Sequence, residues 1–149
     1  MNANGTIFVL ALASNFNPEQ HFKTAYRVLN DLGHAVFSNI YLIPCRDHIG
    51  EDYWNAACLL SSTQPRSSIE AIIKTLEADS GRIRPSHSIS LDVDLIAWGS
   101  DLEKMQFNPK KLPLALDVKI PLYELWQHSD FKVEDNIFSI VDLKYSMST

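Results

Sequence analysis

Cysteine is scarce in this chain, which contains only Cys45 and Cys58, and the two do not form a C-x-x-C pair. The five histidines also stand in no metal-ligand spacing. These two observations argue against a zinc site and against a disulfide scaffold, because both depend on regularly spaced ligands or paired cysteines. We expect both cysteines to be ordinary reduced thiols.

Long apolar segments are missing as well. The run TIFVLALA, residues 6–13, is too short to span a bilayer, and no Lys or Arg precedes it as in a signal peptide. The net charge of −5 argues against a general binder of nucleic acid or anionic membranes, although a local basic cluster can still hold a small phosphate ligand. We therefore expect a cytoplasmic monomer that binds small molecules.

Apolar residues make up 46% of the 149 residues, enough for one domain, 1–149, with a real core. Asn17 with Gln20, and Ser67 with Glu70, stand in capping-box spacing at the start of two helical patterns. The order strand, helix, strand, strand, helix, strand predicts an α+β, ferredoxin-like sandwich with a mainly antiparallel sheet. We expect strands at 7–13, 34–44, 52–63 and 90–99, helices at 18–32 and 66–80, and then a C-terminal extension with loop at 102–121, a short helix at 122–127 and a strand at 137–145.

Two carboxylates share one face of the predicted strand SLDVDLIAWG, because Asp92 and Asp94 are two residues apart. At roughly 5.5–7 Å and an effective dielectric near 20, they repel each other by about 2–3 kcal/mol. A hard divalent cation such as Mg²⁺ compensates such a pair, since it takes carboxylate, water and phosphate oxygens as ligands. The alternative is that both aspartates lie on a solvated face.

Two arginines precede the aspartate strand, at Arg82 and Arg84. The planar guanidinium group matches phosphate oxygens, and together with a metal it supplies the charge neutralisation that phosphoryl transfer needs. Tyr53 and Asn55 share a face of another strand, where a ring beside an amide suits a flat heterocycle. Solvated arginines, core packing of Tyr53 and a turn-edge role for Asn55 are the alternatives.

Three segments, ALASN, DYWNAA and LEADSGRIR with SLDVDLIAWG, together resemble hydroxymethyl-dihydropterin pyrophosphokinase of folate biosynthesis, over residues 6–100. The last segment is the most specific, since the family runs from G-R-x-R to a T-L-D-L-D-I strand that ends in glycine. The resemblance implies transfer of pyrophosphate from ATP to the pterin hydroxymethyl group, with two Mg²⁺ ions. It assigns Asp92 and Asp94 as metal ligands and Arg82 and Arg84 to the triphosphate. It further implies that Glu77 contacts the nucleotide and that Pro44, Tyr53 and Asn55 hold the pterin.

The sequence also departs from the family pattern. Ala13 replaces the glycine of G-S-N, and the loop after Arg84 is shorter and lacks the tryptophan and further arginine of the family. The P-H-Y segment has no clear counterpart, and the nearest match, NPKKLP, offers Lys110 and Lys111 to phosphate. Two alternatives therefore stay open: a weak or inactive paralogue that binds nucleotide or pterin as a sensor or partner protein, and a plain interaction module with solvated aspartates.

Overall fold

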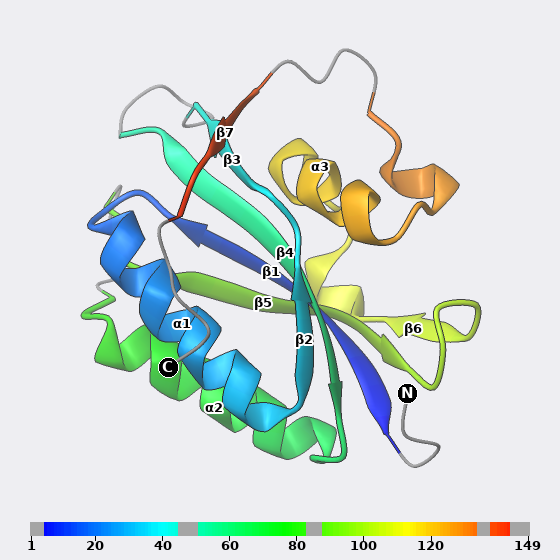
Figure 1. Cartoon of the computed structure of the whole chain (residues 1–149). Coiled ribbons are helices and arrows are strands. Elements are labelled where there is room, and N and C mark those ends of the chain that lie inside the picture. The colour runs from blue at the N-terminus through cyan, green and yellow to red at the C-terminus, as the bar shows by residue number, and fades with distance from the viewer. Residues whose placement is uncertain (1–4, 45–50, 83–87, 134–137, 144–149) are drawn as a thin grey trace.

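The computed structural model describes residues 5–44, 51–82, 88–133 and 138–143. Within these ranges the strands form one sheet in the order β6-β5-β1-β4-β3-β7, with β2 also paired to β4, and all the pairs are antiparallel (Figure 1). The strands are β1 (Thr6–Ser14), β2 (His34–Phe37), β3 (Ile40–Ile43), β4 (Tyr53–Ser62), β5 (Asp92–Gly99), β6 (Met105–Phe107) and β7 (Ser139–Val141).

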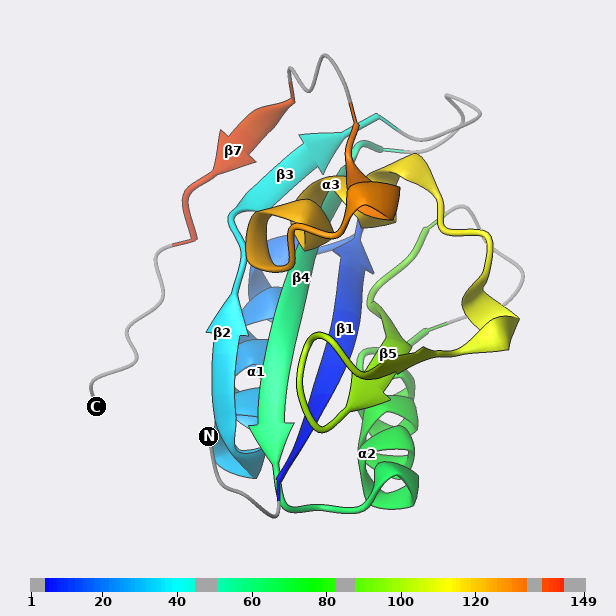
Figure 2. The ribbon, with the colours of Figure 1, turned by 90° about the vertical axis from the view of Figure 1, so that its right-hand side faces the viewer.

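Helices cover both faces of this sheet (Figure 2). Alternate residues of β1 explain the two layers: Leu10 and Leu12 pack with α1 and α2 on one face, whereas Val9 and Ala11 pack with α3 on the other. This arrangement confirms the predicted ferredoxin-like sandwich. The helices are α1 (Pro18–Leu32), α2 (Arg66–Asp79) and α3 (Leu116–Leu125), with two 3₁₀ turns, η1 (Pro109–Lys111) and η2 (Ser129–Phe131).

The predicted strand 34–44 is divided into β2 and β3 at Ser38. The Ser38 backbone N–H donates to the Ala57 carbonyl at 2.9 Å, and the Ser38 Oγ accepts from the Ala57 N–H at 2.8 Å. The side chain therefore takes over a bond that an uninterrupted strand would make with its backbone. Both halves still pair with β4.

Both predicted capping boxes are wrong. Asn17 precedes α1 in the left-handed region, with φ 48° and ψ 49°, and its side chain makes no cap hydrogen bond. The second helix begins at Arg66, after Pro65, so Ser67 already lies inside it. Arg66 Nε instead contacts Glu70 Oε1 at 3.0 Å, an ion pair one turn apart.

The C-terminal extension differs most from expectation. β6 was not predicted, and α3 begins at Leu116, inside the segment expected to be loop, and continues through Pro121. Ile120, Pro121 and Leu122 are all buried, so packing against the sheet outweighs the backbone hydrogen bond that proline cannot donate. The final strand is confirmed, since β7 lies within the predicted range 137–145.

Gly33, between α1 and β2, lies where only a hydrogen atom fits. An added Cβ would collide with the carbonyl oxygen of Ser61 and lie 3.1 Å from Ser62 Cα, both of them backbone atoms that cannot rotate away. We expect Gly33→Ala to lower the free energy of unfolding by about 2–4 kcal/mol, measured by urea denaturation. Gly81→Ala is the comparison: its φ is 86° but its Cβ would meet open space, so we expect a loss of only about 1–2 kcal/mol. Equal losses for the two variants would contradict this account.

Among the residues that the structure describes, the helices are too short or too polar to cross a bilayer.

Candidate active site at the open edge of strand β5

The two aspartates lie at the start of β5 and on the same face of the strand, as predicted. Asp92 pairs with Ala13 and Asp94 with Ala11, on the sheet face opposite α1 and α2, whereas Val93 between them is buried in the helix-covered core. Both aspartates are half-buried. The small side chains of Ala11 and Ala13 leave the neighbouring strand flat beside the two carboxylates.

Beside the aspartates, in the part of the chain that the structure describes, the outer edge of β5 has side chains in place of a partner strand. β6 pairs only with Ala97–Gly99, further along the strand. Glu77 on α2 accepts a hydrogen bond from the Val93 N–H at its Oε2 atom, at 3.0 Å, and Asn108 Nδ2 donates to the Leu95 carbonyl at 2.9 Å. These two contacts tie α2 and the turn η1 to either end of the same edge segment.

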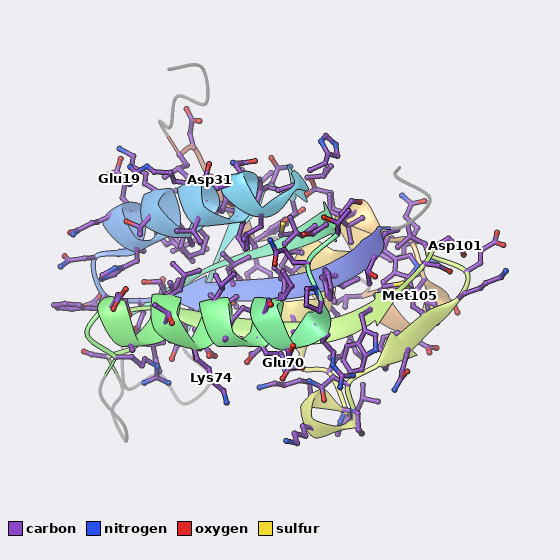
Figure 3. All side chains as sticks on the ribbon, turned by 90° about the horizontal axis from the view of Figure 1, so that it is seen from below. Glu19, Asp31, Glu70, Lys74, Asp101 and Met105 are labelled. Carbon is purple, nitrogen blue, oxygen red and sulfur yellow. The ribbon has the colours of Figure 1, made fainter. Side chains whose placement is uncertain are left out.

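A cavity of about 370 Å³ lies between α2, this edge of β5 and η1. Figure 3 shows Glu70 and Lys74 on the side of α2 that faces away from α1. The two aspartates and the two lysines of η1 line the same cavity, so it combines carboxylates with ammonium groups. Its lining residues are Glu70, Ile73, Lys74, Glu77, Asp92, Val93, Asp94, Leu95, Asn108, Lys110 and Lys111.

Asp92 holds its proton unusually tightly. Burial, followed by a hydrogen bond with Glu77 and by the charge of Glu77, raises the pKa of Asp92 to about 6, while Arg82 and Lys111 oppose the rise. The ionised form of such a carboxylate is unfavourable unless positive charge lies beside it. A cation placed beside it would therefore bind favourably.

Lys111 contacts the second aspartate directly. Its Nζ lies 2.8 Å from Asp94 Oδ1, with 38% of the lysine side chain and 25% of the aspartate side chain exposed. Burial lowers the pKa of Lys111, but the hydrogen bond and the negative charge of Asp94 outweigh it, so the net change is upward. Sequence reasoning favoured Lys110, which also lines the cavity, and left open whether either lysine reaches the site.

The predicted pterin residues lie across the sheet from the aspartates. Asn55 is 3% exposed and pairs with Ala13, which pairs in turn with Asp92, so the three stand in one row on one face. Asn55 and Asp92 are therefore two strands, about 10 Å, apart. Tyr53 shares this face and is half-buried, while Trp54 points to the other face and packs on Phe22 with ring centroids 5.8 Å apart.

The remaining predicted residues are distributed around these groups. Arg82 follows Gly81 just beyond α2, is half-buried, and its charge acts on Asp92. Pro44 is exposed and follows Ile43, the residue of β3 that pairs with Tyr53. Arg84 lies outside the described residues, so the structure does not test its place over the phosphates.

Sequence reasoning gave no role to Ser14 and Asn15, although both belong to the segment ALASN on which the resemblance rests. Ser14 Oγ donates to the Ser90 carbonyl at 2.6 Å, and the Asn15 N–H donates to the Ile89 carbonyl at 2.9 Å. Asn15 Oδ1 also accepts from the Ile89 N–H. These two buried polar residues hold the chain that leads into Asp92.

A comparison with protein families found one match. The model of the 7,8-dihydro-6-hydroxymethylpterin-pyrophosphokinase (HPPK) family matches residues 9–134, from β1 to beyond η2. The chain belongs to this family. The match extends past residue 100, where the resemblance was expected to fade, and so includes the lysines of η1. HPPK members carry out pyrophosphoryl transfer in folate biosynthesis. A comparison with curated proteins gave no match.

Proposed function

We propose that this HPPK-family chain transfers pyrophosphate from ATP to the hydroxymethyl group of 6-hydroxymethyl-7,8-dihydropterin. The hydroxyl oxygen attacks the β-phosphorus of ATP, the bond from that phosphorus to the α,β-bridging oxygen breaks, AMP leaves, and the hydroxyl proton is released to water. The observation that carries the proposal is the pair of Asp92 and Asp94 on an open strand edge beside a cavity of about 370 Å³. Family membership supplies the reaction class.

The donor atoms at this edge fit Mg²⁺. Two carboxylates project from one face of β5, Asp92 has a raised pKa, and Asp94 already attracts a cationic side chain. Carboxylate oxygens are the ligands that Mg²⁺ takes in nucleotide sites, and two ions are expected from the resemblance. When bound, Mg²⁺ neutralises charge on the phosphates that are transferred.

The other residues bind and orient the two substrates. Arg82, Arg84 and Lys110 supply positive charge to the triphosphate, and Asn55 and Tyr53, with Pro44, hold the flat pterin ring. Glu77 is proposed to contact the nucleotide, although its Oε2 atom accepts from the Val93 N–H. Since phosphoryl transfer depends mainly on position and charge, this set suffices without a dedicated general base.

The experiment is the rate of AMP formation from Mg²⁺-ATP, with and without the pterin. We expect AMP only when pterin and Mg²⁺ are both present.

Asn55→Ala should raise the KM for pterin about tenfold or more and leave the KM for ATP unchanged, because a buried amide that hydrogen-bonds the ring edge is lost. Gln106→Ala, at an exposed position on β6, is the control. Equal changes in both KM values would contradict the role of Asn55.

A second candidate function is a paralogue that binds nucleotide or pterin without turnover. The ion pair between Lys111 and Asp94 favours it, because an ammonium group stands where the proposed reaction needs a metal. Titration calorimetry separates the two functions. Mg²⁺-ATP binding without any pterin-dependent AMP, at high protein concentration, would support the binding paralogue.

A further inference from the structure

The Lys111 ammonium group lies on the carboxylate that is proposed to bind a metal, with Nζ 2.8 Å from Asp94 Oδ1. We propose that Lys111 is an intramolecular competitor of divalent cations at Asp94. In the free protein it neutralises this carboxylate, and it must leave before Asp94 can bind a metal ion. The inference rests on the proposed function only for the assignment of Asp94 as a metal ligand.

The position of Lys111 is built into the fold by Asn108. The Asn108 N–H donates to the Ile96 carbonyl at 2.8 Å and its Nδ2 donates to the Leu95 carbonyl at 2.9 Å, which fixes the start of η1 on β5. Its Oδ1 accepts from the Lys110 N–H at 3.1 Å, and its carbonyl accepts from the Lys111 N–H at 3.0 Å. These hydrogen bonds fix the position of η1 and therefore place Lys111 beside the aspartates.

The charges around Lys111 attract its ammonium group but do not prevent its displacement. Asp94, Asp92 and Glu77 all attract Lys111, and they come from β5 and α2. The lysine side chain is nevertheless 38% exposed, so water screens the pair and can solvate the ammonium once it is displaced. A doubly charged ion with several oxygen ligands can therefore compete for the same carboxylate.

The test uses Mn²⁺ alone as the probe, without nucleotide, and measures free Mn²⁺ by electron paramagnetic resonance during titration of the whole chain. We expect Lys111→Met to bind Mn²⁺ about tenfold more tightly than the wild type, because the competing charge is gone. Lys104→Met is the control, at an exposed lysine outside the cavity lining, and its affinity should stay within about twofold of the wild type. In the Lys111→Met background, Asp94→Asn should abolish the gain.

Three results would overturn the inference: unchanged or weaker Mn²⁺ binding by Lys111→Met, an equal gain for Lys104→Met, or a gain that survives Asp94→Asn. Thermal melts establish that each variant is folded. Since no turnover is measured, the inference and the proposed function can fail separately. Tighter Mn²⁺ binding by Lys111→Met without AMP formation by the wild type would support the competitor and reject the kinase.

Discussion

We expect Asp94→Asn to lower the pterin-dependent rate of AMP formation by about 10³-fold or more, while the protein remains folded. The amide keeps the shape of the side chain but removes the negative charge that the proposed metal requires. The substitution also removes the ion pair with Lys111, whose Nζ lies 2.8 Å from the wild-type carboxylate. Initial rates of AMP release at saturating Mg²⁺-ATP and pterin measure the effect.

Glu103→Gln is the matched control for this variant. Glu103 is an exposed carboxylate on the turn after β5, away from the cavity lining, so its neutralisation should leave the rate within about twofold of the wild type. A rate for Asp94→Asn above about one tenth of the wild-type rate would mean that Asp94 holds no essential metal.

We expect Asp92→Asn to stabilise the metal-free protein at neutral pH, by about 2–3 kcal/mol, even though it removes a proposed metal ligand. The pKa of Asp92 is about 6 in the folded chain, against an ordinary value of 3.8 for an aspartate side chain. The folded state therefore binds this proton more tightly than the unfolded state does. Stability falls as the pH rises from about 4 to about 6, and the whole penalty is present above pH 6. A neutral amide carries no such penalty.

Thermal melts in EDTA between pH 4 and pH 8 test this prediction. At pH 8 we expect the Tm of Asp92→Asn to exceed that of the wild type by roughly 5–10 °C, and the difference should vanish near pH 4. Asp31→Asn, at an exposed position on α1 (Figure 3), should leave the Tm unchanged at both pH 4 and pH 8. A lower Tm for Asp92→Asn at pH 8 would show that Asp92 stabilises the fold as a carboxylate.

Under the proposed function, metal binding and the stability of the free protein make opposite demands on Asp92. Burial beside Glu77 makes the ionised form of Asp92 unfavourable in the free protein. A cation bound beside Asp92 would stabilise that ionised form. Enzymes often keep such strained groups at the expense of stability. We expect added Mg²⁺ to recover part of the loss because it binds only the folded state.

The alternation of the strands was sufficient to predict the shared face of Asp92 and Asp94 and that of Tyr53 and Asn55. A period of two is a local property, so it needs no knowledge of the rest of the fold. Both long helices were predicted, but their predicted side-chain caps were wrong, because Asn17 precedes α1 in the left-handed region and an extended Pro65 precedes α2. Helix α3 was largely missed since burial of Pro121 outweighs its low helix propensity.

The contacts that complete the site join residues that are distant in sequence. Glu77 reaches the Val93 N–H across the open edge, and Lys111 reaches Asp94 from a turn 17 residues further on. No local pattern indicates that one of two adjacent lysines makes the ion pair and the other does not. The Asn-Pro step before them was the available signal, because asparagine often fixes a turn through its side chain.

The identity of the products tests the central claim most directly. ³¹P nuclear magnetic resonance of a reaction with ATP, Mg²⁺ and 6-hydroxymethyl-7,8-dihydropterin should show AMP and the pterin diphosphate accumulating in equal amounts. Neither product should form when Asp92 and Asp94 are both asparagine. Formation of ADP and inorganic phosphate instead, or an unchanged spectrum at high protein concentration, would contradict pyrophosphoryl transfer by this chain.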